Sequence, residues 1–182
     1  MTLPRELTLT ESSEGVRLKQ TPVSELEKIR QEIYSLHEFV LQPNQNILSD
    51  VSGDQLEIIA EFELDSATEF GFKLRKSDSE ETIIEYDVAE ESLFVNRTTS
   101  GLTDFNEYFP CTHSAPLSIK NKRVRLRIYV DWSSVEIFGN DGEMVITDQI
   151  FPDPASKGLE LYTKNGNVKL VSLLIFQLES TI

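Results

Sequence analysis

Strict alternation over residues 123–143 constrains the fold of this chain more than any other feature of its sequence. Five apolar residues alternate there with five polar or aromatic ones: Val124, Leu126, Ile128, Val130 and Trp132 against Arg123, Arg125, Arg127, Tyr129 and Asp131. Because successive side chains of a strand point to opposite faces, this run has one apolar face and one basic face. Polar turns at 131–134 and 139–142 lead into two further strands that end near residue 150. The stretch therefore predicts a β-meander.

The rest of the chain repeats this pattern of short strands and turns. Further strands are predicted at residues 7–11 and 15–20 around a turn at Gly15, and at 33–41, 56–64, 70–75, 82–87, 93–95, 158–164 and 168–178. The pattern contains no long helix and no regular alternation of strands with helices, which excludes a parallel α/β fold. We therefore expect an all-β protein, an antiparallel β-sandwich of two sheets.

One short helix is predicted, at residues 24–30. Ser24 and Glu27 have the spacing of a capping box, in which each side chain binds a backbone amide near the other residue. A helix this short is marginal without packing, so we interpret it as a linker between two domains. The predicted organisation is an inter-domain linker segment at residues 1–31, with a hairpin and the helix, followed by a β-sandwich domain at residues 32–182.

The last predicted strand is apolar on both faces. Leu170, Leu174 and Phe176 share one parity, and Val171, Leu173 and Ile175 share the other. Because a strand with two apolar faces is usually covered on both, we expect the first set to join the sandwich core. The N-terminal segment and the helix, through residues such as Leu26 and Ile29, are then predicted to cover the second set.

The charge of the chain excludes one class of partner. It carries 31 acidic and 17 basic residues, a formal net charge of −14, whereas binding nucleic-acid phosphates needs a basic surface. The candidate basic patch is the arginine stripe, which consists of Arg123, Arg125 and Arg127. We expect this stripe to face solvent and to pair with the acidic face of another strand, formed by Glu57, Glu61 and Glu63.

The residues that usually bind metals are scarce. Cys111 is the only cysteine, which excludes an intrachain disulfide and a cysteine-based zinc site, and the two histidines, His37 and His113, are too few for a histidine-rich site. We therefore expect no metal and no cofactor. No apolar run reaches the roughly 18–20 residues that span a bilayer, and the first residues lack the features of a signal peptide, so no membrane association is expected.

Four residues are candidates for binding a carbohydrate, and none is a candidate for catalysis. Trp132 has a flat ring on which a sugar can stack, but its parity groups it with the core residues, which favours packing. Asp131 and Glu136 are able to accept hydrogen bonds from sugar hydroxyls, although a solvated or arginine-paired face is the simpler interpretation. Arg97, in the polar run NRTTSG, can anchor its loop, contact a partner domain or bind a ligand, and these three roles stay open. No nucleophile motif or phosphate-binding loop marks a catalytic centre.

Several segments, taken in order, resemble a known family. The run DWSSVEIFGNDGE, followed by ITDQIFPDP and GLELYTKNGNVKLVSLLIFQL, is similar to the C-terminal β-sandwich of glycoside hydrolase family 32. These enzymes are the β-fructosidases, which include levanases, inulinases and invertases. The run MTLPRELTL resembles the junction between the family's catalytic β-propeller and its sandwich, and FGFKLRKSDSEETIIEYD, LFVNRTTSG and SAPL follow in the family's order. The resemblance implies two stacked sheets of the jelly-roll, lectin-like kind.

The resemblance also implies a function. None of the family's three catalytic carboxylate motifs occurs in this chain, so we expect a non-catalytic module that is inactive alone and assists a catalytic propeller in the same polypeptide. The alternatives are an autonomous module that binds fructan (levan or inulin) and a sandwich that forms homodimers. For a levanase-type parent, the resemblance favours an extracellular or cell-surface location over a cytoplasmic one.

Overall fold

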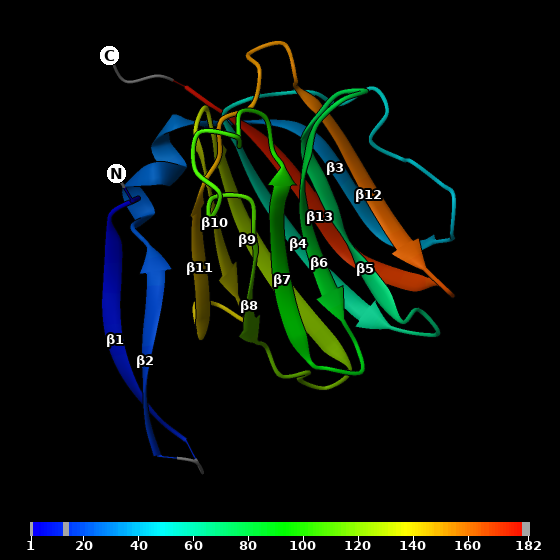
Figure 1. The fold of residues 1–182 in the computed structure, drawn as a ribbon. Coiled ribbons are helices and arrows are strands. Elements are labelled where there is room, and N and C mark those ends of the chain that lie inside the picture. Colours follow the sequence, from blue (N-terminus) through cyan, green and yellow to red (C-terminus); the bar gives the residue numbers. More distant parts are fainter. Residues whose placement is uncertain (1, 13–14, 180–182) are drawn as a thin grey trace.

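The computed structural model describes residues 2–12 and 15–179 and consists almost entirely of antiparallel strands. Two sheets face each other, and a separate hairpin stands beside them at the left of Figure 1. The strand order is β11-β10-β9-β4-β13-β3 in the six-stranded sheet and β12-β5-β6-β7-β8 in the five-stranded sheet. This architecture confirms the predicted two-sheet antiparallel sandwich.

The elements have the following bounds. The hairpin consists of β1 (Arg5–Ser12) and β2 (Gly15–Pro22), and the short helix η1 (Ser24–Ile29) follows it. The six-stranded sheet contains β3 (Arg30–Leu41), β4 (Leu56–Leu64), β9 (Arg123–Asp131), β10 (Ser134–Gly139), β11 (Met144–Gln149) and β13 (Val168–Leu178). The five-stranded sheet contains β5 (Glu69–Lys76), β6 (Glu81–Asp87), β7 (Ser92–Thr99), β8 (Thr112–Pro116) and β12 (Gly158–Lys164).

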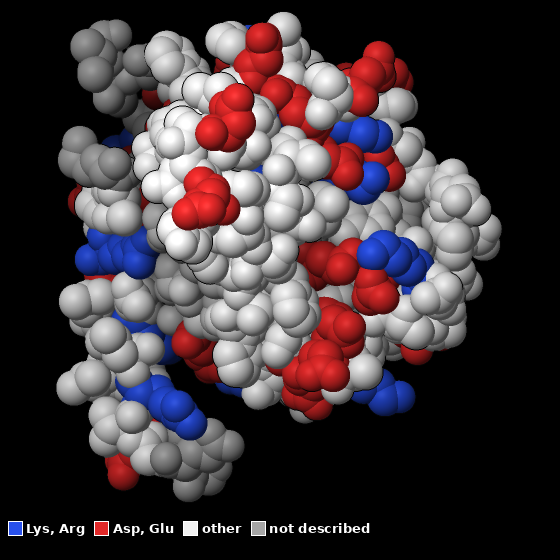
Figure 2. Space-filling view, in the orientation of Figure 1, with Lys and Arg blue, Asp and Glu red and all other residues white. Residues whose placement is uncertain are grey.

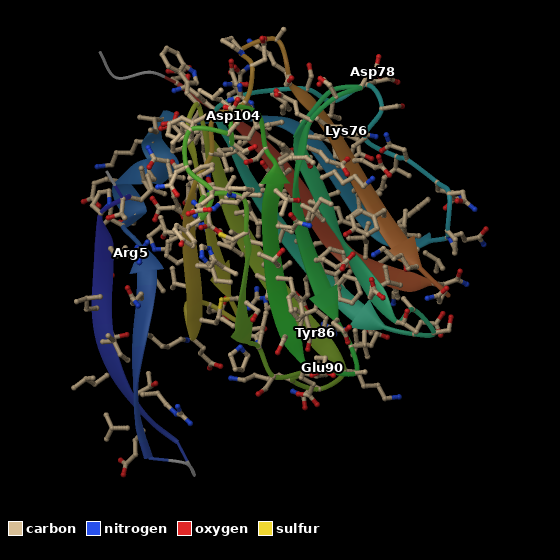
Figure 3. All side chains as sticks on the ribbon, viewed as in Figure 1. Arg5, Lys76, Asp78, Tyr86, Glu90 and Asp104 are labelled. Carbon is tan, nitrogen blue, oxygen red and sulfur yellow. The ribbon has the colours of Figure 1, made fainter. Side chains whose placement is uncertain are left out.

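The core lies between the two sheets, and the predicted meander supplies one wall of it. The meander forms β9, β10 and β11, whose inward side chains, such as Ile128 and Ile137, are fully buried. From the facing sheet, Phe70 packs on Phe62 of β4 with ring centroids 4.6 Å apart. Tyr86, labelled in Figure 3, closes one end of this core, because its hydroxyl donates a hydrogen bond to the carbonyl oxygen of Leu117 at 2.8 Å.

The parity predicted for the last strand is wrong beyond Leu170. A bulge interrupts the pairing of β13 with β4 between Leu170 and Ser172, and an extra residue in a strand turns the following side chains to the opposite faces. Leu173 and Ile175 therefore point into the core, where both are fully buried. Phe176 lies instead on the outer face of the six-stranded sheet, opposite Glu57 of β4.

Trp132, predicted to pack either in the core or in the turn, lies in the turn and not in the core. The strand β9 ends at Asp131, so Trp132 belongs to the turn before β10 and no longer follows the alternation of the strand. Its side chain is 67% exposed. Arg75 contacts the backbone of this turn, since its guanidinium lies 3.5 Å from the carbonyl oxygens of both Asp131 and Trp132.

The predicted helix exists, but its predicted cap does not. Residues 24–29 form a single 3-10 helix whose N-cap is Val23, with no side-chain capping bond, so Ser24 lies inside the first turn. No residue of η1 is fully buried, and Leu26 and Ile29 are half-buried. The face that they were predicted to cover is not formed as predicted, because Leu173 and Ile175 point into the core. No helix in the described part of the chain is long and apolar enough to cross a membrane.

The helix is part of a segment that joins opposite edges of the six-stranded sheet. The preceding strand β2 lies against β11 at one edge, whereas the following strand β3 forms the other edge. Residues 23–29, which we call the crossing segment, therefore pass over the outer face of this sheet. The structure does not test the predicted boundary between residues 31 and 32, and the turn residues 13–14 of the predicted hairpin lie outside the described residues.

Candidate functional site

The four candidate residues lie in three separate places and do not form one site. Asp131 and Trp132 occupy the exposed turn between β9 and β10, where the carboxylate Oδ1 of Asp131 accepts a hydrogen bond from the Trp132 amide at 2.8 Å. Glu136 lies on β10, on the outer face of the six-stranded sheet, and Arg97 lies on β7 in the five-stranded sheet. Their roles as carbohydrate ligands stay predictions.

Arg97 anchors a loop in this structure, which is one of its three predicted roles. Its guanidinium donates to the carbonyl oxygen of Gln149 at 3.1 Å and stacks over the ring of Phe109, 4.2 Å from the ring centroid. Phe109 belongs to the long irregular segment between β7 and β8, and it packs with Phe105 and Phe151 in an aromatic cluster. In Figures 2 and 3 a largely uncharged surface surrounds this loop near Asp104.

Glu136 ties the N-terminal segment to the sandwich. Its side chain is only 3% exposed, and its Oε2 atom lies 2.5 Å from the guanidinium of Arg5. Its Oε1 atom accepts a hydrogen bond from the backbone amide of Leu3 at 2.6 Å. Of the two simpler interpretations, the arginine-paired one therefore holds for Glu136, while Asp131 is exposed to solvent. Arg5 also lies over the ring of Phe138, 5.2 Å from the centroid, so it covers part of the outer face of the sheet.

The arginine stripe pairs with the predicted acidic strand. Arg123 contacts Glu61 at 2.7 Å and Glu63 at 3.1 Å, and Arg125 contacts Glu61 at 3.5 Å. This pairing is confirmed, and it follows from the antiparallel register of β4 with β9, which places each arginine opposite a glutamate or beside one. Arg123 and Arg125 reach solvent as predicted, while Arg127 is more deeply placed.

Glu57, a predicted partner of the arginine stripe, is the centre of an ionic cluster whose burial the sequence did not indicate. Its side chain is 0% exposed, and its carboxylate lies 2.5 Å from Arg127 and 3.3 Å from Arg30. The hydroxyl of Tyr129 donates a third contact to it at 3.0 Å. Burial raises the pKa of Tyr129, and the neighbouring Glu57 carboxylate raises it further, so the hydroxyl keeps its proton and stays a donor.

Arg30 connects this ionic cluster to the crossing segment and to the last strand. Its guanidinium lies over the ring of Phe176, 4.4 Å from the centroid, and so covers the aromatic side chain that the bulge turned outward. Glu27 of the crossing segment reaches Arg30 at 3.7 Å and Arg127 at 3.8 Å. Contacts of Arg30 therefore fasten this part of the N-terminal segment to the outer face.

Two hollows lie on the outer face near these contacts. A cleft of about 260 Å³ lies beneath the base of the hairpin, between Pro22 and the side chains of Ile59 and Phe138. A larger groove of about 590 Å³ lies beyond it and is lined mainly by charged residues. Several of those residues form ion pairs with one another, including Arg123 with Glu61 and Arg125 with Asp141. Much of the charge in the groove is therefore neutralised within it.

The hairpin presents an apolar face that neither sheet covers. Leu9 of β1 lies directly opposite Leu18 of β2, and both are exposed, Leu9 to 74%. Leu7 and Val16 extend the same face on either side of this pair, and both are also exposed. A hydrogen bond fastens the base of the hairpin to the sandwich: the Gln20 amide donates to the carbonyl oxygen of Gly142 at 2.9 Å.

Comparison with known proteins places this geometry in a family. Residues 25–177 match the family model described as glycosyl hydrolases family 32 C terminal. The chain is 50% identical to a levanase of Bacillus subtilis (strain 168) over 97% of its length and 43% identical to a levanase of Bacillus sp. (strain L7) over 98%. The solved structure of exo-inulinase from Aspergillus awamori superposes with a TM-score of 0.91 at 31% identity and covers the whole chain.

The extent of these matches also shows which part of the relatives this chain resembles. It spans 27% and 20% of the two levanases and 36% of the exo-inulinase chain. The hairpin lies before the first residue of the family-model match. Most of the crossing segment and the strands of the two sheets lie within the match, and β13 extends one residue beyond its end. The chain belongs to glycosyl hydrolase family 32 and forms the family's C-terminal β-sandwich domain.

Proposed function

We propose that this domain is a non-catalytic module of a fructan-hydrolysing enzyme and that its hairpin docks on the catalytic domain of the same polypeptide. The exposed apolar face of the hairpin carries this proposal. An isolated two-stranded hairpin is marginally stable in water, and a contiguous exposed apolar face usually marks an interface. Covering Leu9 and Leu18 alone gains roughly 1.5–3 kcal/mol for each side chain.

The position of the hairpin supports a partner within the same polypeptide. The hairpin precedes the residues that the family model matches, and the relatives are several times longer than this chain. A hairpin that is fixed at its base by Arg5 and Gln20, and whose apolar face is exposed, suits a surface that holds two domains at a set angle. Docking of this kind stabilises the catalytic domain without contributing any catalytic group.

The docking proposal predicts a loss of thermal stability in a chimera. We consider the levanase of Bacillus subtilis in which this chain replaces its 50%-identical counterpart. Leu9→Ser combined with Leu18→Ser is expected to lower the Tm of the chimera and to shorten the half-life of its levan-hydrolysing activity about tenfold, because two interfacial side chains lose their burial. Calorimetry and residual activity after heating measure the two effects.

The adjacent rung of the hairpin supplies a matched control. Thr8 lies opposite Lys19, on the other face of the same two strands, so Thr8→Ala combined with Lys19→Ala alters the hairpin equally near its middle. This pair is expected to leave the Tm and the half-life unchanged. Equal effects of both pairs contradict docking through the apolar face. A change confined to the oligomeric state identifies a second copy of this chain as the occupant.

The exposed Trp132 favours a second candidate function, an autonomous fructan-binding module. Its ring is open to solvent beside the Asp131 carboxylate, and such rings can stack on sugars. Trp132 is the only tryptophan of the chain, so its fluorescence reports directly on this turn. Under the docking proposal, levan and inulin produce no saturable change in fluorescence or heat. A saturable signal that Trp132→Ala abolishes in calorimetry establishes the binding module instead.

A further inference from the structure

A cluster of reactive side chains lies where the edges of the two sheets meet. The strands β11 and β8 are edge strands of different sheets and contact each other on this side of the sandwich. Asp148 comes from β11, His113 from β8 and Arg97 from β7, and Cys111 lies immediately before β8. The cluster therefore joins residues from both layers.

The distances in this cluster define a relay of a thiol, an imidazole and a carboxylate. The Sγ atom of Cys111 lies 3.5 Å from Nε2 of His113. The other ring nitrogen, Nδ1, lies 2.7 Å from Oδ1 of Asp148. A carboxylate at this distance holds the imidazole proton on Nδ1, which leaves Nε2 to accept the proton of the thiol. A nucleophile, a base and a group that orients the base thus stand in sequence.

Asp148 is built into this site at a cost in stability. It is only 2% exposed, and its Oδ2 atom has no hydrogen-bond partner among the residues that the structure describes. A buried carboxylate oxygen without a partner destabilises the folded state. A purely structural role therefore does not explain why Asp148 occupies this position. The Asp148 carboxylate stabilises His113 when the ring becomes an imidazolium, because the two groups then form a close ion pair.

Arg97 provides a second positive group at the sulfur. Its Nε donates to the Cys111 Sγ at 3.3 Å, and its NH1 lies 3.6 Å from Asp148. The stack on Phe109 and the bond to the Gln149 carbonyl hold the guanidinium in this orientation. Positive groups beside a partly exposed cysteine are a feature that reactive cysteines share.

We propose that Cys111 is a reactive thiol site for small peroxides, with His113 as its proton acceptor and donor, Arg97 as the thiolate-stabilising group and Asp148 as the positioning residue. A peroxide is favoured over a larger electrophile because Cys111 is half-buried. A peroxide also benefits from a proton donor beside the sulfur, which alkylation does not need.

The reaction balances within these groups. The thiol proton passes to Nε2 of His113, and the thiolate sulfur then attacks one oxygen of the peroxide. A sulfur–oxygen bond forms as the oxygen–oxygen bond breaks, and the departing oxygen takes the proton from the imidazolium. The sulfur loses two electrons to the peroxide, and the products are a sulfenic acid and an alcohol or water. Because the chain contains one cysteine, reduction of the sulfenic acid needs an external thiol.

The single cysteine makes the test unambiguous, since every thiol signal comes from Cys111. The full 182-residue chain is treated with hydrogen peroxide, the sulfenic acid is trapped with dimedone, and the intact mass is followed over time. We expect the folded chain at pH 6 to react about tenfold faster than the same chain unfolded in guanidinium chloride, as for other cysteines in a positive environment. His113→Gln and Arg97→Gln are each expected to remove most of this acceleration.

Three further measurements separate a reactive site from loop packing. His37→Gln removes the other histidine, which lies on β3, and is expected to leave the rate unchanged. Asp148→Asn is expected to lower the ratio of the rate at pH 6 to the rate at pH 9, a readout that a structural role does not move. Each variant is first checked for native circular dichroism, and His113, with its side chain 49% exposed, tolerates substitution best. A folded chain that reacts no faster than the unfolded one, or a His113→Gln variant that reacts like the parent, overturns the proposal.

Discussion

Replacing Glu57 with alanine is expected to lower the free energy of unfolding by about 3 kcal/mol, the low end of the range for breaking a buried ion pair. The carboxylate is completely buried between two guanidiniums and the hydroxyl of Tyr129. Without it, Arg30 and Arg127 face each other across an empty site and Tyr129 loses its acceptor. The effect falls at the low end because both arginines remain partly exposed and keep some contact with water.

Glu63 provides the matched control on the same strand. It faces outward with the same parity as Glu57 and pairs with one arginine, Arg123, at 3.1 Å, but its side chain is half-buried rather than fully buried. Glu63→Ala is expected to change the unfolding midpoint little, because exposed ion pairs are screened by solvent. Urea denaturation with an unchanged slope measures both values. Similar losses for the two variants contradict the central role of Glu57.

The contrast between these two glutamates shows what the sequence could predict. The alternation within β4 and β9 indicated which side chains share a face, and the antiparallel pairing followed from it. The alternation could not indicate that Glu57 is buried, because the residue that covers it, Arg30, belongs to a different segment of the chain. Burial of a strand face depends on what crosses it, and that is a property of the connections rather than of the strand.

The wrong parity predictions have a common physical cause. Parity arguments assume an unbroken strand, whereas β13 contains a bulge after Leu170 and β9 ends one residue before Trp132. An inserted residue or a turn changes the facing of every later side chain while leaving the composition of the segment unchanged. Neither feature has a glycine or proline at its centre to signal it in the sequence.

The candidate sites were harder to predict than the fold, because each brings together residues distant in sequence. Glu136 and Arg5 are 131 residues apart, and His113 and Asp148 are 35 apart. The sequence indicated Arg97 and Glu136 as candidate binding residues, but not the particular residues that they contact. The hairpin face is different, because the apolar alternation at Leu7, Leu9, Val16 and Leu18 is visible in the sequence. It could have been predicted to be exposed by asking whether any other strand was left to cover it.

Deleting residues 1–30 is expected to leave a folded sandwich that aggregates. Both sheets and their core persist, because the crossing segment contributes no buried residue. The deletion nevertheless removes Arg5 from Phe138 and Arg30 from Phe176, so two aromatic rings on the outer face lose their cover. It also leaves the Glu57 carboxylate with one arginine fewer. Exposed aromatic surface of this kind promotes association.

A shorter deletion separates the role of the crossing segment from that of the hairpin. Removing residues 1–22 takes away the four exposed aliphatic side chains of the hairpin and uncovers Phe138 as the longer deletion does, but it keeps Arg30 on Phe176 and Glu57. This variant is expected to stay monomeric and to be more soluble than the full chain, while the deletion of residues 1–30 forms concentration-dependent oligomers in light scattering. Circular dichroism checks that both variants are folded. If the longer deletion is monomeric and as soluble as the shorter one, Arg30 does not protect the outer face. In that case the exposure of Phe176 does not cause association, and the hairpin is the surface through which this domain binds a partner.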